Sequence, residues 1–92
     1  MTEAIARRVV VHGRVQGVFY RDSCQREASS HNVAGWVRNC PDGAVEALFE
    51  GDDADVERLV DWARTGPRTA VVEQAEVEEV EPVGLTRFEV RG

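Results

Sequence analysis

The amino-acid sequence predicts an α+β fold, in which two helices pack on one face of a four- to five-stranded antiparallel sheet. Two observations predict it. Segments with strand and helix character follow one another in the order β-α-β-β-α-β along 92 residues. The first strand-like run is apolar at consecutive positions, which is typical of a strand inside a sheet. This order favours the split βαβ, or ferredoxin-like, arrangement. The length suits one domain over residues 1–92, with residues 1–6 as a loose N-terminal tail.

The first half of the chain predicts one strand and one helix. Residues 7–12 form a strand around the β-branched run Val9–Val11, and Gly13 ends it. Residues 21–31 suit a helix that starts near Asp22 and Ser23. Its expected buried line follows spacings of three and four residues and consists of Tyr20, Cys24, Ala28 and His31.

The second half predicts four further strands and a second helix. Residues 33–39 and 44–50 alternate in character, and the turn sequence at residues 41–43 between them predicts a β-hairpin. Asp52, Asp53 and Asp55 favour a helix N-terminus through capping and the helix dipole. The helix that follows carries the clearest apolar stripe of the chain: Val56, Leu59, Val60 and Ala63. Residues 70–80 form a strand with a solvated acidic face, and residues 85–90 form a short closing strand.

Composition excludes several classes of function. The net charge of −6 argues against a nucleic-acid-binding surface, which is normally basic. No apolar run approaches the roughly 20 residues that span a bilayer. Residues 1–8 lack the apolar region of a signal peptide, so we expect a cytoplasmic protein without a membrane partner. All 11 basic residues are arginines, which excludes a lysine nucleophile or Schiff base.

The side chains that could bind a soft metal are few. They are Cys24, Cys40, His12 and His31, and none has the spacing of a zinc site. We therefore expect neither a metal nor another cofactor. Two cysteines are too few for a disulfide framework, and the sequence leaves open whether they pair.

The connection between the first strand and the first helix is the strongest candidate for chemistry. Gly13 and Gly17 allow backbone angles that turn several N–H groups inward, as in an anion-binding nest. The connection leads into a helix N-terminus, which favours a negative ligand. Arg21 lies at this junction, where a guanidinium can clamp two phosphoryl oxygens. Taken alone, these residues also fit a plain connecting turn with a surface arginine.

Asn39 ends the second predicted strand. In a split βαβ unit the first two strands run parallel, with another strand between them, so their carboxyl ends lie at one edge of the sheet. Asn39, Arg21 and the glycine-containing loop would therefore meet there. An amide can hold both a water molecule and a phosphoryl oxygen. The alternative is that Asn39 has only a structural role, in which it favours the turn before Pro41.

Two segments of the sequence resemble the acylphosphatase family. Residues 13–21, from Gly13 to Arg21, resemble its first signature, and Gly35–Asn39 followed by residues 42–46 resembles its second. The resemblance to this family also includes Gly66, Pro67, residues 70–72 and Phe88. The similarity extends from about Arg7 to Val90.

The resemblance implies a hydrolase that cleaves acyl phosphates to a carboxylate and inorganic phosphate. It implies that Arg21 binds the phosphoryl group and that Asn39 orients the attacking water. The backbone N–H groups of Gln16, Gly17, Val18, Phe19 and Tyr20 complete the binding cradle. No metal or cofactor is implied, and the expected partners are a small acyl phosphate and inorganic phosphate, acted on by a monomer.

Several alternatives stay open at this level. His12 lies just before the loop and is either a general base or a structural residue. Cys24 as a nucleophile lacks the Cys-x5-Arg loop of phosphatases that form a phosphocysteine. The same fold hosts RNA-binding and ligand-sensing modules, and the same motifs occur in a carbamoyl-phosphate-handling domain of a larger maturation factor. The physiological acyl phosphate, the oligomeric state and any adaptation of stability to growth conditions are not determined by the sequence.

Overall fold

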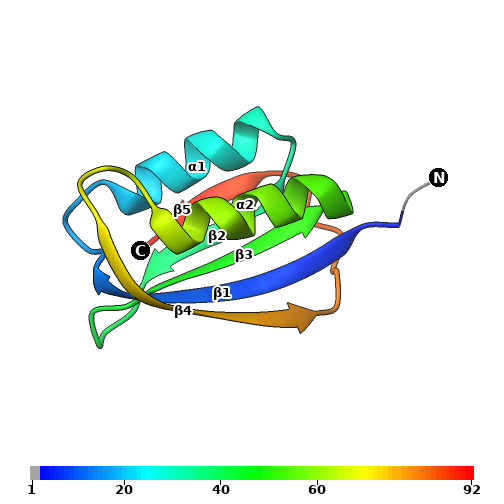
Figure 1. Cartoon of the computed structure of the whole chain (residues 1–92). Coiled ribbons are helices and arrows are strands. Elements are labelled where there is room, and N and C mark those ends of the chain that lie inside the picture. Colours follow the sequence, from blue (N-terminus) through cyan, green and yellow to red (C-terminus); the bar gives the residue numbers. More distant parts are fainter. Residues whose placement is uncertain (1–2) are drawn as a thin grey trace.

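Residues 3–92, which the computed structural model describes, form five strands and two helices (Figure 1). The elements are β1 (Ile5–Arg14), α1 (Tyr20–Ser30), β2 (Ala34–Asn39), β3 (Val45–Gly51), α2 (Asp53–Thr65), β4 (Val71–Val80) and β5 (Phe88–Arg91). Both helices lie on one face of the sheet, as predicted (Figure 1). Neither helix in residues 3–92 is long and apolar enough to cross a membrane.

The strands form a single sheet in the order β4-β1-β3-β2-β5. Strand β1 pairs antiparallel with both β3 and β4, and β2 pairs antiparallel with β3. The prediction of a purely antiparallel sheet is wrong at one edge, where β5 runs parallel to β2. The physical reason is the connection between β4 and β5, which returns the chain to the opposite edge of the sheet, so that β5 runs in the same direction as β2.

This topology brings distant segments to one edge of the sheet. Because β1 and β2 are both antiparallel to the strand between them, they run parallel and end on the same side. Helix α1 begins there, and β5 ends there as well (Figure 1, left side). The loop after β1, the start of α1 and the end of β2 are therefore neighbours.

The core lies between the sheet and the helices. Alternate residues of β1, including Val9 and Val11, are buried against the helices, opposite Ala47 and Val45 of β3. Helix α2 contributes the four residues of the predicted apolar stripe, all of them buried. The buried Tyr20 hydroxyl donates a hydrogen bond of 2.7 Å to the carbonyl oxygen of Ala63, and this bond joins the two helices.

The boundaries of several elements differ from the predictions. Residues 5 and 6 already belong to β1, and Ala6 is buried, so the tail predicted over residues 1–6 is too long; residues 1 and 2 lie outside the described part of the chain. Helix α1 begins at Tyr20, one residue earlier than expected, and His31 is its half-buried C-cap rather than a core residue. Asp52 is the N-cap of α2, but in the described part of the chain its side chain makes no capping hydrogen bond.

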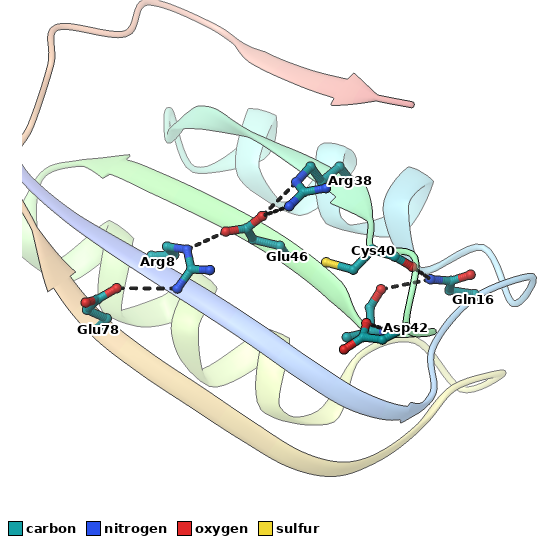
Figure 2. Close-up of polar contacts among 8 residues, drawn as sticks. Arg8, Gln16, Arg38, Cys40, Asp42, Glu46 and Glu78 are labelled. Carbon is teal, nitrogen blue, oxygen red and sulfur yellow. Dashed lines mark hydrogen bonds and ion pairs between the residues drawn. The ribbon is translucent and has the colours of Figure 1, made fainter.

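The sheet face opposite the helices carries a buried carboxylate. Glu46 is 5% exposed and lies between Arg8 and Arg38, which both donate to it (Figure 2). The Arg38 bond is 2.7 Å long, and Arg8 also reaches Glu78 at 3.4 Å. A carboxylate can be buried here because two guanidinium groups replace its water. Arg38 is thus a structural residue of the open face.

Candidate active site

A concave pocket of about 300 Å³ lies at the sheet edge where β1 and β2 end. It is lined by Val15, Gly17, Phe19, Tyr20, Arg21, Asp22 and Asn39. The structure therefore brings together Arg21 and Asn39, the two side chains singled out in the sequence.

The loop between β1 and α1 has the backbone of an anion-binding nest. Gly17 has φ 73° and Phe19 has φ 62°, so two left-handed residues alternate with ordinary ones just before the helix. Within residues 3–92, the backbone N–H groups of residues 16–22 donate to no other protein group, and α1 has no side-chain N-cap. Several unpaired donors at a helix N-terminus favour an oxyanion through their partial charges and the helix dipole.

Arg21 brings a full positive charge to these donors. It lies in the first turn of α1 and is half-buried. Its Nη1 atom donates to the carbonyl oxygen of Arg91, the last residue of β5, at 3.2 Å. This bond holds one side of the guanidinium at the sheet edge, while the planar group retains further N–H donors for a ligand.

Asn39 enters the pocket from the sheet. It pairs with Val45 of β3 and shares the helix-facing side of β2 with the buried Val37. Its Oδ1 atom is buried and has no hydrogen-bond partner among the described residues. Leaving a buried carbonyl unsatisfied costs about 1–3 kcal/mol, so the position is suited to a ligand or water that donates a hydrogen bond to it.

Gln16 connects the loop to the β2–β3 turn. Its Nε2 atom donates to the carbonyl oxygens of Cys40 and Ala44, both at 2.8 Å (Figure 2). Cys40 directly follows Asn39, so the amide of Gln16 ties the N–H-bearing loop to the strand end that carries Asn39. Asp42 tightens the same turn by accepting from the N–H of Ala44 at 3.0 Å.

Comparison with known proteins agrees with this arrangement. Residues 7–90 match the family model of acylphosphatase. The chain belongs to the acylphosphatase family. It is 54% identical over 90 residues to an acylphosphatase of Gloeobacter violaceus, covering 98% of this chain and 97% of that protein.

Solved structures show the same fold. An acylphosphatase from Coxiella burnetii superimposes with a TM-score of 0.91 at 34% identity, covering 96% of this chain and 93% of the other. Full-length HypF, in a phosphate- and nucleotide-bound form, matches with a TM-score of 0.88 at 25% identity. That match covers all of this chain but 12% of HypF. The family fold therefore occurs both in small acylphosphatases and as one part of a larger protein.

The side chains proposed as alternatives lie elsewhere in this acylphosphatase fold. His12 is absent from the pocket lining, and its Nε2 atom lies 2.9 Å from Glu76 Oε1 of β4. Cys24 is buried, and this burial raises the pKa of its thiol, which keeps it protonated and unreactive. Both cysteines are free thiols. In the described residues no group of three His, Cys, Asp or Glu side chains could hold a metal ion.

Other residues of the site were not anticipated from the sequence. Val15 and Asp22 line the pocket, and the hydroxyl of Thr69, between α2 and β4, donates to the carbonyl of Val18 and holds the loop from outside. No local pattern marks Thr69, because its partner is 51 positions away. Gln16 and Val18 were predicted to bind substrate through their backbone N–H groups, and neither residue is among those that line the pocket. Their side chains point to the β2–β3 turn and to the core, which leaves only their backbone N–H groups for a ligand.

Proposed function

We propose that this chain is an acylphosphatase that hydrolyses the carboxyl–phosphate bond of acyl phosphates without a metal ion or another cofactor. One observation carries the proposal: N–H groups and an Asn39 Oδ1 atom that have no partner within residues 3–92 meet the Arg21 guanidinium at one pocket. The first two bind an oxyanion, and the third accepts a hydrogen bond from water.

The reaction follows from these roles. The phosphoryl oxygens bind the N–H groups of residues 16–20 and the guanidinium of Arg21. Asn39 Oδ1 accepts a hydrogen bond from the attacking water and orients the oxygen atom of that water toward phosphorus. Charge accumulates on the equatorial oxygens in the transition state, where fixed donors stabilise it. The leaving carboxylate is stable as it departs and needs no general acid. The water proton passes to a phosphate oxygen.

The test is the release of phosphate from benzoyl phosphate, with and without a chelator. We expect activity that the chelator does not change. Arg21→Ala should lower kcat/KM by about 10³-fold or more, since charged donors to a transferring phosphoryl group contribute on this scale. Asn39→Ala should lower kcat by about 10²-fold and leave inhibition by inorganic phosphate nearly unchanged.

The matched control is Arg26→Ala, which removes an exposed arginine of the same helix. It should retain the activity of the original protein. Full activity in folded Arg21→Ala would refute the proposed function. Equal losses of kcat and of phosphate affinity in Asn39→Ala would show that Asn39 binds phosphate rather than water. Urea denaturation of each variant establishes that it is folded.

We propose further that the protein acts as a cytoplasmic monomer with residues 1–92 as one domain. A single core cluster joining the sheet to both helices supports one domain, and two free thiols suit a reducing compartment. The net charge of −6 does not favour nucleic acid as a partner. Sedimentation equilibrium at micromolar concentration tests the oligomeric state, and a dimer would contradict the proposed monomer.

A further inference from the structure

Phe19 is an exposed aromatic residue whose side chain contributes little to the stability of the fold. Its side chain is 72% exposed, so burial of the ring contributes little to stability. Its φ of 62° lies in the left-handed region, which side chains with a β-carbon disfavour and which Gly and Asn adopt readily. It is nevertheless the N-cap of α1 and lines the pocket.

The geometry of the reaction indicates which part of a substrate meets Phe19. In phosphoryl transfer the attacking water and the leaving group lie on opposite sides of phosphorus, roughly in line. Asn39 Oδ1, which receives the water, is buried against the sheet. The leaving acyl group must therefore point away from that buried end and toward the exposed rim of the pocket. Phe19 is the exposed aromatic side chain at this rim.

We infer that the ring of Phe19 contacts the acyl group and determines specificity for it. This inference rests on the proposed acylphosphatase function and adds the chemical class of the acyl group. A flat apolar acyl group, such as benzoyl, can pack against the ring and shield it from water. A short acyl group, such as acetyl, ends before it reaches comparable contact. The enzyme is expected to prefer the larger apolar acyl group at equal phosphoryl chemistry.

The experiment compares kcat/KM for benzoyl phosphate and acetyl phosphate, and follows the ratio of the two. Taking the ratio cancels any change in the cradle, because the phosphoryl group is common to both substrates. Phe19→Asn removes the ring and suits the left-handed backbone, so this variant should fold. Its ratio should fall about 3- to 10-fold, the scale of one aromatic contact. Phe19→Tyr keeps the ring and should retain the ratio of the original protein.

A matched control is Val83→Ala in the connection between β4 and β5. Val83 is 71% exposed and lies outside the pocket lining, so its removal should not change the ratio. A ratio in Phe19→Asn within twofold of the original protein, with both substrates hydrolysed, would overturn the role of Phe19 and leave the proposed function intact. If the original protein hydrolyses neither substrate, the proposed function itself fails.

Discussion

The two hydrogen bonds of Gln16 allow a quantitative prediction for the variant Gln16→Met. Methionine has a similar length but no donor, so the bonds to the carbonyls of Cys40 and Ala44 are both lost. Each carbonyl keeps a backbone partner, because the Cys40 oxygen also accepts from Gly43 at 3.2 Å and the Ala44 oxygen from Cys40 at 2.8 Å. No buried acceptor is orphaned, so only the net value of two hydrogen bonds is lost.

At about 0.5–1.5 kcal/mol for each bond, the free energy of unfolding should fall by about 1–3 kcal/mol. For a domain of this size that corresponds to a decrease in Tm of about 4–24 °C. Urea denaturation followed by tryptophan fluorescence measures the change. Because the same bonds hold the strand end next to Asn39, kcat for benzoyl phosphate should fall by about tenfold in folded Gln16→Met. The KM should change little.

The matched control is Gln74→Met, which replaces an exposed glutamine of β4. Neither stability nor kcat should change by more than the experimental error. If Gln16→Met is as stable as the original protein, the connection between the loop and the turn does not depend on these bonds. A loss of stability with unchanged kcat would show that Gln16 supports the fold but does not position Asn39.

Two further predictions concern buried ionisable groups. Glu50 is 4% exposed and accepts the backbone N–H groups of Val83, Gly84 and Leu85, each at 2.9 Å. Glu50→Ala should lower the free energy of unfolding in urea by about 2–4 kcal/mol and speed hydrogen exchange at Gly84, whereas unchanged exchange would contradict the role of this carboxylate. Burial raises the pKa of both Tyr20 and Cys24, so above pH about 8.5 the unfolded chain loses protons that the folded chain retains. Stability should therefore be fully present at neutral pH and fall as pH rises, by up to about 1.4 kcal/mol per pH unit for each group. Cys24→Ala should remove the part that begins near pH 8.5, and an unchanged alkaline profile in that variant would refute the assignment.

The sequence alone determined the order of the elements and the side of α2 that faces the core. Apolar spacing is a local property, and it correctly placed the stripe of α2 and the interior position of β1. The sequence also identified candidates for an anion-binding site, namely the two glycines of the loop, Arg21 and Asn39. Each of these residue types offers a limited set of backbone angles or hydrogen-bonding groups. The parallel course of β1 and β2 followed from the element order, and it was enough to bring these residues to one edge.

Only the tertiary structure decided how the site is held. The hydrogen-bond partners of Gln16, Arg21 and Thr69 lie 24 to 70 positions away in the sequence, so no local pattern predicts these bonds. Strand β5 has four residues, and its parallel direction depends on where the long connection returns the chain. His12 is likewise held by a distant residue, because Glu76 of β4, 64 positions away, lies 2.9 Å from its Nε2 atom. The residue types in the local sequence therefore indicated the candidate groups of the site, while contacts between distant segments determined their positions.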